Sequence, residues 1–101
     1  MKTVIGALNK AFESRIRLGI MSILMVNDAV DFNTLKEQLQ MTDGNLASHL
    51  AALEKANFII INKQFIGKKP NTSYQASTEG RKAFTEHLDA LEKFIRQSSN
   101  L

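Results

Sequence analysis

The apolar residues of this chain change their spacing at one place, and that change limits the fold more than any other feature. Up to residue 56 they recur every three or four positions, the spacing of helices that bury one face. From Phe58 the sequence reads FIIINKQF, a β-branched and aromatic run typical of a strand. A turn segment, IGKKPN, and a second strand, TSYQAS, follow and predict a β-hairpin. After residue 77 helical spacing returns, so the expected order is helices, one hairpin and a last helix.

Four helices are expected before the hairpin, two of them in the first 27 residues. Ser14 is expected to cap the second helix, RIRLGIMSILMVN. The apolar residues that define the first helix are Val4, Ile5, Leu8 and Phe12, and the inward residues of the second are Ile16, Ile20, Ile23 and Leu24.

A short extended piece, AVDF, separates these from two further helices. Asn33 is expected to cap TLKEQLQ, and Thr42 is expected to cap a helix from Asp43 to Ala56. The inward leucines of this pair are Leu35, Leu39, Leu46, Leu50 and Leu53.

Length and composition indicate an ordinary folded domain. The chain has 101 residues, 44% hydrophobic and 23% charged, so residues 1–101 are expected to form one domain. No apolar run approaches the roughly 20 residues of a membrane span, and the N-terminus lacks a signal cleavage pattern. We therefore expect a cytoplasmic protein with no membrane contact. With no cysteine and only His49 and His87, neither a metal site nor a cofactor is expected.

Positive charge is concentrated around the hairpin. Between residues 62 and 82 five basic residues face one acidic residue, a local charge of +4 against +3 for the whole chain. The residues counted are Lys63, Lys68, Lys69, Arg81 and Lys82, against Glu79. Such a patch is typical of a protein that binds a polyanion, although a solvated surface strand would also carry lysines.

The helix from Asp43 to Ala56 has an unusual outward face. Surface helices usually turn Glu and Lys to water, but the side opposite the leucines here carries Gly44, Ser48, Ala51 and Ala52, with Asn45 beside them. Gly44 argues against a choice made for helix propensity alone, because glycine costs up to about 1 kcal/mol inside a helix. A slim outward face suits close approach to a partner.

The last helix is expected from Thr78, as its cap, to about residue 98. Its apolar residues follow the spacing of a coiled-coil seam: Phe84, Leu88, Leu91 and Ile95. Such a seam can pack on the chain's own core or on a second copy. We favour a homodimer, with Val4, Ile5 and Leu8 as a second part of the interface.

The order of these pieces resembles the small winged-helix transcription regulators related to the MarR and ArsR groups. The stretches that carry the resemblance are IRLGIMSIL, TLKEQL, TDGNLASHLAALEKANFI and FIGKKPNTSYQASTEGRKAF, between about Ser14 and Phe84. The resemblance implies a mainly α fold with a small β-hairpin wing (α+β). Residues 14–77 would form a winged helix-turn-helix, and residues 1–13 and 78–98 would be terminal helices that dimerise.

The resemblance also implies the site. Thr34 to Leu39 would be the supporting helix and Asp43 to Ala56 the recognition helix in the DNA major groove. The recognition residues implied are Thr42, Asp43, Gly44, Asn45, Ser48 and His49, and the wing residues are Lys63, Lys68, Lys69, Asn71 and Thr72. Many relatives carry Ser or Thr at the position of Ala47 and Lys or Arg at that of Ala51, so the wing would supply more of the affinity here. Arg15 stands where relatives often have Pro.

The function expected is sequence-specific binding of double-stranded DNA by a transcription regulator. A protein-interaction module without specific DNA binding is the alternative. An enzyme is not expected, because the chain has no GxSxG motif and no phosphate-cradling loop. The operator, the direction of regulation and any small-molecule effector are not readable from the sequence.

Overall fold

The structure, a computed structural model, describes residues 5–99. Two 3-10 turns, η1 (Ile5–Ala7) and η2 (Lys10–Phe12), precede four helices and three strands. In chain order these are α1 (Arg15–Met25), β1 (Val30–Asp31), α2 (Phe32–Leu39), α3 (Asp43–Lys55), β2 (Ile59–Ile66), β3 (Lys69–Ala76) and α4 (Thr78–Ser98). The expected α+β winged-helix fold is confirmed.

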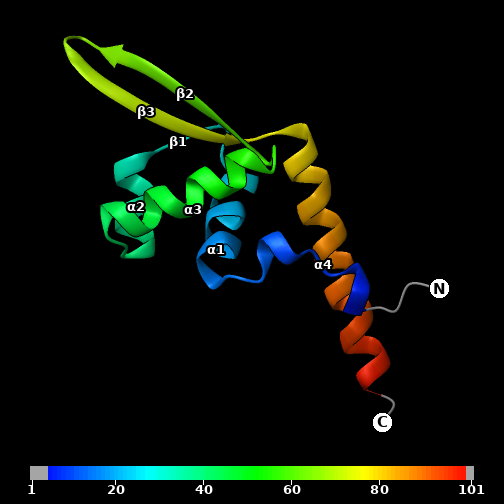
Figure 1. Ribbon diagram of the computed structural model, residues 1–101. Coiled ribbons are helices and arrows are strands. Elements are labelled where there is room, and N and C mark those ends of the chain that lie inside the picture. The colour runs from blue at the N-terminus through cyan, green and yellow to red at the C-terminus, as the bar shows by residue number, and fades with distance from the viewer. Residues whose placement is uncertain (1–4, 100–101) are drawn as a thin grey trace.

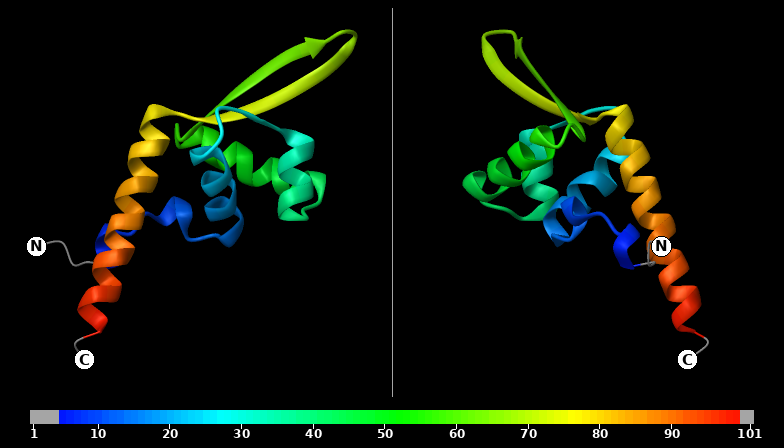
Figure 2. Two further views of the ribbon diagram at one scale, coloured as in Figure 1. Left: turned by 180° about the vertical axis from the view of Figure 1, so that it is seen from behind. Right: turned by 45° about the vertical axis from the view of Figure 1, so that its right-hand side comes forward.

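The helices α1, α2 and α3 pack together, and the hairpin β2–β3 projects from them as a wing (Figure 1). The sheet is antiparallel in the order β1-β3-β2, so the short β1 joins only the inner end of the wing. Helix α4 leaves the body in another direction, and its C-terminal half extends beyond it (Figure 2). The wing and α4 together stretch the molecule to 58 × 25 × 21 Å.

The N-terminal segment differs from the prediction. One helix through Leu8 and Phe12 was expected, but Asn9 has an extended backbone (φ −87°, ψ 122°) that separates η1 from η2. The side chain of Asn9 accepts the Ala11 N–H at 2.9 Å and so caps a new turn instead of continuing the old one. Val4 lies outside the described residues.

Side-chain caps start each of the longer helices, two of them as predicted. Ser14 caps α1, and Thr42 caps α3 by accepting the Asn45 N–H. The other two predictions are wrong by one or two residues. Asp31, not Asn33, caps α2, and its pKa is lowered because it accepts the Thr34 N–H. Ser77, not Thr78, caps α4.

The core forms where the three-helix cluster meets the sheet and α4. The buried apolar residues are Phe12, Ile20, Met21, Leu24, Val30, Leu35, Leu46, Leu50, Leu53, Ile59, Tyr74, Ala76, Phe84 and Ala90. The inward leucines of α3 are confirmed, whereas Ile16, Ile23 and Leu39 are only half-buried. Burial of these side chains supplies the main drive for folding, because it removes their apolar surface from water.

The wing is longer than expected because the turn is shorter. The structure pairs Ile66 with Lys69, so only Gly67 and Lys68 connect the strands. Gly67 has φ +64°, as the first central position of a type II′ turn requires. Pro70 lies within β3 opposite Phe65, where β1 no longer pairs with β3. The missing N–H of Pro70 therefore faces an open edge, which a proline tolerates.

Helix α4 is locked to the chain that leaves α3. The Phe58 carbonyl accepts the Ser77 N–H at 3.0 Å, and the Ser77 hydroxyl donates to the Asn57 carbonyl at 2.7 Å. The buried Gly80 brings the first turn of α4 against the Phe58 backbone. Any Cβ at this position would overlap the Phe58 carbonyl oxygen.

We therefore expect Gly80→Ala to destabilise the protein by about 3 kcal/mol, because backbone atoms on both sides would have to shift. Urea denaturation measures this loss. Gly44→Ala is the matched control: a Cβ at Gly44 meets no atom within 4 Å, and alanine should stabilise α3 by up to about 1 kcal/mol. Equal stability of the two variants would contradict the close approach at Gly80.

Candidate nucleic-acid interface

The outer face of α3 is exposed and made of small residues. Leu46, Leu50 and Leu53 point into the core, which turns the opposite side of the helix to solvent. The exposed residues of the first three turns are Asp43, Gly44, Asn45, Ala47, Ser48 and Ala51. Asn45 and Ser48 can donate hydrogen bonds from this face, and the small residues let a partner surface approach the helix backbone closely.

The start of α3 is anchored to α2 by an ion pair. Lys36 Nζ lies 2.7 Å from Asp43 Oδ1, and the Asp43 side chain remains 72% exposed. The pair offsets the negative charge that Asp43 would otherwise present beside the helix N-terminus. The oxygen of Thr42 accepts the Asn45 N–H, which leaves its hydroxyl proton able to donate outward.

His49 lies at the edge of this face and is held by α1. Arg17 Nε donates to His49 Nδ1 at 3.1 Å, and both side chains are half-buried. Burial, and secondarily the charge of Arg17, lowers the pKa of His49 below its ordinary value. No motif in the sequence marks this pairing, because Arg17 and His49 lie 32 positions apart.

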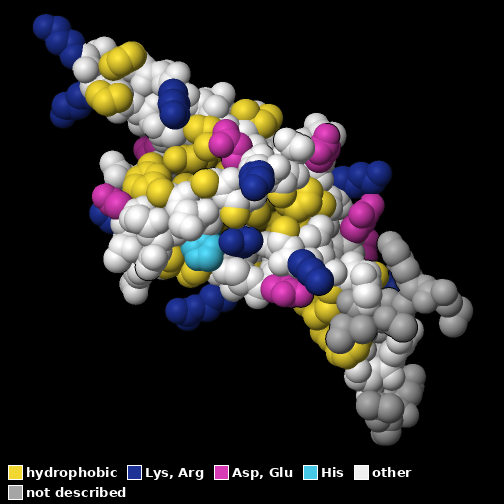
Figure 3. All heavy atoms as spheres, in the orientation of Figure 1, with side chains coloured by type: hydrophobic (Ala, Val, Ile, Leu, Met, Phe, Trp, Pro, Cys, Tyr) yellow, Lys and Arg dark blue, Asp and Glu magenta, His cyan; other side chains and the backbone are white. Residues whose placement is uncertain are grey.

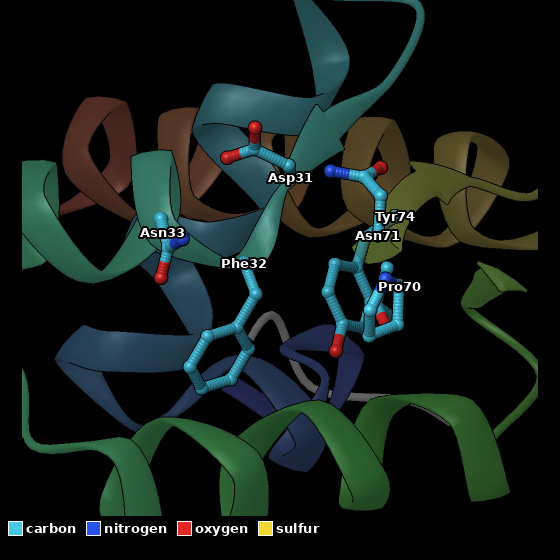
Figure 4. A pocket seen from close by; sticks show the side chains of 7 residues that line it. Asp31, Phe32, Asn33, Pro70, Asn71 and Tyr74 are labelled. Atoms are coloured by element: carbon cyan, nitrogen blue, oxygen red, sulfur yellow. The ribbon is translucent and has the colours of Figure 1, made fainter. Parts of the chain in front are cut away.

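The wing residues predicted to bind DNA fall into two groups. Lys63, Lys68 and Lys69 are exposed. Asn71 and Thr72 are half-buried and line a pocket of about 230 Å³ between β3 and the start of α2. Figure 4 shows that pocket with Asp31, Phe32 and Asn33 on one side and Pro70, Asn71 and Tyr74 on the other. Burial raises the pKa of Tyr74, and the nearby Glu54 adds to the shift.

The basic residues between positions 62 and 82 do not form one patch in the structure. Arg81 is half-buried, and its guanidinium donates to the Met25 and Leu24 carbonyls at 3.2 and 3.4 Å, so it caps the C-terminus of α1. The three wing lysines stand apart from it, and no acidic residue occurs between residues 55 and 78. In Figure 3 the outer end of the wing, at upper left, shows dark blue side chains and no magenta.

The apolar residues of α4 fall into a buried group and an exposed group. Phe84 is 3% exposed and meets Phe12 edge-on, with 5.2 Å between ring centroids, so it belongs to the chain's own core. This corrects its prediction as an interface residue. His87 is buried beside it and accepts the Asn9 N–H at 3.0 Å. Further along, Leu88, Leu91, Phe94 and Ile95 remain 38–60% exposed.

Of the other predicted interface residues, Leu8 is half-buried, and Val4 and the side chain of Ile5 lie outside the described part of the chain. Within residues 5–99 no group of three or more metal-ligating side chains comes together. No helix in that range is long and apolar enough to cross a membrane.

A helix-turn-helix followed by a basic hairpin defines a class of DNA-binding domains, and the sequence agrees. Residues 16–95 match the winged helix DNA-binding domain family, and the chain belongs to that family. Members of this family and fold are generally not enzymes. The winged-helix resemblance predicted from the sequence is confirmed by this family match.

Individual proteins are similar to this chain in sequence or in structure. An uncharacterised protein of Methanocaldococcus jannaschii is 37% identical over 79 residues, which cover 78% of this chain and 86% of that protein. The transcriptional regulator homologue from Pyrococcus horikoshii has a similar structure, with a TM-score of 0.80, 28% identity and 86% of each chain covered. HlyU from Vibrio cholerae is also similar, with a TM-score of 0.60, 25% identity, and 75% of this chain and 78% of that chain covered.

The Arg17–His49 contact predicts a measurable pKa. By NMR titration, the imidazole of His49 should titrate below about 6.5 in the free protein and shift back upwards in Arg17→Gln. Because the folded state disfavours the proton, this histidine stabilises the fold above pH 6.5. That contribution is lost as the pH falls through the folded-state pKa. A pKa at or above 6.5 in the free wild type would contradict the contact.

Proposed function

We propose that this protein is a transcription regulator that binds specific sequences of double-stranded DNA as a homodimer in the cytoplasm. The observation that carries the proposal is the pairing of a slim, exposed α3 with an acid-free basic wing. Both lie at one end of the molecule (Figure 1). The family supports DNA as the partner. We treat residues 1–101 as one functional unit.

The recognition helix would read bases through its first turns. A major groove about 12 Å wide admits a helix, and the small face of α3 lets the backbone approach the base edges. In this arrangement Asn45 and Ser48 donate to base edges, while Thr42 and the first free N–H groups of α3 hold a phosphate. Gly44 leaves room for that phosphate. His49, held by Arg17, would reach only the margin of the groove.

The wing would supply affinity that does not depend on sequence. Lys63, Lys68 and Lys69 are exposed and have no acidic neighbour on the hairpin, so each is available to a phosphate. Asn71 and Thr72, which line the pocket between β3 and the start of α2, would contact backbone on the side facing α2. Asp43 would position Lys36 rather than touch DNA, because the two are already paired.

The outer half of α4 is the part of the structure that favours a homodimer. The four apolar side chains from Leu88 to Ile95 are partly exposed, and α4 extends beyond the body of the protein. A second copy packed along this surface would place two α3 helices around a two-fold axis. They would then address grooves about 34 Å apart on one side of the duplex.

The first experiment is an anisotropy titration of a labelled duplex taken from upstream of the protein's own gene, against a scrambled duplex, at two salt concentrations. A preference for the native duplex with a steep salt dependence is expected. If neither duplex binds at low salt, the proposal is wrong and a protein-interaction module becomes the better interpretation.

Two pairs of substitutions separate the roles of helix and wing. Lys68→Ala with Lys69→Ala should weaken binding to every duplex and reduce the salt slope by about 1 to 2 units, because phosphate contacts are lost. Asn45→Ala and Ser48→Ala should each reduce the preference for the native duplex by about 1–3 kcal/mol and leave the slope unchanged. An unchanged preference would remove Asn45 and Ser48 from base reading.

For the dimer, Leu91→Asp with Ile95→Asp should give monomers in sedimentation equilibrium, since the charges would be desolvated between copies. Circular dichroism should remain unchanged, because both side chains are already partly exposed. Val26→Asp is the control: Val26 is 80% exposed and lies at the end of α1, away from the outer half of α4. Association that survives the double substitution would exclude this face.

A further inference from the structure

The outer part of the wing carries large apolar side chains that the fold does not use. Strand β1 pairs with β3 only as far as Ser73. Beyond that point, residues 63–72 of β2, the turn and β3 form a two-stranded ribbon, here called the wing tip. Phe65 is 74% exposed and Ile66 is 63% exposed. In Figure 3 yellow side chains stand among the dark blue ones at this end of the molecule.

Folding alone does not account for these residues. The turn needs only Gly67, whose positive φ sets its geometry. A threonine or valine would satisfy the strand propensity at position 65 as well as phenylalanine does. The cross-strand neighbour of Phe65 is Pro70, which leaves most of the larger ring in solvent. An exposed aromatic side chain on an open ribbon favours aggregation, so its presence indicates a partner.

The charges around the tip identify the chemistry of that partner. All the charged residues of the wing tip are lysines: Lys63, Lys68 and Lys69. The nearest acidic residues along the chain are Glu54 and Glu79, at the far ends of the hairpin and outside it. In space, Asp31 of the body lines the pocket beside Pro70, Asn71 and Thr72, on the side of the tip that faces α2. The lysines flank Phe65 and Ile66 along the ribbon itself. An apolar centre flanked by cations complements a surface that combines a polyanionic rim with stackable apolar rings. The minor groove of DNA has both.

The position and the shape of the wing tip are compatible with the minor groove as its partner. The wing tip and the start of α3 lie on the same side of the molecule, away from α4, in all three views (Figures 1 and 2). A duplex with α3 in its major groove therefore passes the wing where the adjacent minor groove faces it. Phe65 and Ile66 are neighbours on β2, so they point to opposite faces of a thin ribbon. A ribbon inserted into a groove would therefore present an apolar side chain to the bases from either of its faces.

Resting on the proposed function, we propose that Phe65, supported by Ile66, is an apolar wedge that enters the minor groove and partly unstacks one base step. The three lysines hold the flanking phosphates. Pyrimidine–purine steps such as TA unstack most easily, so the wedge selects them in the flank of the binding site without hydrogen bonds to bases. Phe65 is thus a specificity-determining residue separate from α3.

The test compares Phe65→Thr with wild type on the 40-base-pair duplex that wild type enriches from a random library. Donor and acceptor dyes at the duplex ends report bending, and 2-aminopurine at the flanking step reports unstacking. Wild type should bend the duplex and brighten 2-aminopurine. Phe65→Thr should bind about tenfold more weakly, the loss expected for one aromatic contact to bases, and should lose both signals. Its salt slope should stay unchanged because the lysines remain.

A second arm measures specificity. Replacing a TA step in the wing-side flank by GG should weaken wild type severalfold and leave Phe65→Thr unaffected. Val26→Thr, which alters a similarly exposed apolar residue outside the wing tip, should behave as wild type in every measurement. Because Phe65 is exposed, the thermal midpoint of Phe65→Thr should match that of wild type.

The outcomes separate this inference from the function on which it rests. If Phe65→Thr binds and bends the duplex as wild type does, the wedge is overturned while DNA binding stands. If Phe65→Thr instead abolishes self-association, the tip is a contact between copies and the wedge is likewise overturned. If wild type enriches no duplex from the library, the proposed function fails and this inference fails with it.

Discussion

The arrangement of the whole molecule depends on the junction where α3 ends and α4 begins. Ser77 donates its N–H to Phe58 and its hydroxyl to Asn57, and its side chain accepts the Gly80 N–H at 2.8 Å. These bonds close the base of the hairpin, because β2 starts at Ile59 and β3 ends at Ala76. The direction of the wing and the direction of α4 are therefore set at one point. The absence of a side chain at Gly80 makes that approach possible.

The functional surfaces radiate from this junction and are chemically distinct. The wing carries lysines and no acidic residue of its own, α3 presents small polar side chains, and the outer half of α4 presents apolar ones. Two polar side chains of α4 bond to the body of the protein and not to the wing or to α3. Arg81 caps the C-terminus of α1, and His87 accepts the Asn9 N–H. Because the surfaces stay separate, a substitution in one should leave the others intact.

Much of the fold and part of the candidate site were predictable from local patterns. Helical spacing places Leu46 and Leu50 inward, and this alone turns Asn45 and Ser48 outward. The caps show the limit of such reasoning. Asp31 and Asn33 are both good N-caps, and local sequence does not tell which one has the extended backbone that a cap requires. Strand β1 settles this, because Asp31 pairs with Ser73 of β3 and so is held extended.

The sequence by itself determined the order of elements from α1 onward, the inward leucines of α3 and the lysines of the wing, since these follow from residue type and spacing along one segment. Only the tertiary structure decided which side chains remain available. Phe84 and Leu88 look alike in the seam of α4, yet Phe84 is buried against Phe12 and Leu88 is exposed. Arg17 resembles a solvated residue until α1 meets α3 at His49. Whether a side chain is free to bind a partner depends on contacts between distant segments of the chain. No local pattern in the sequence encodes those contacts.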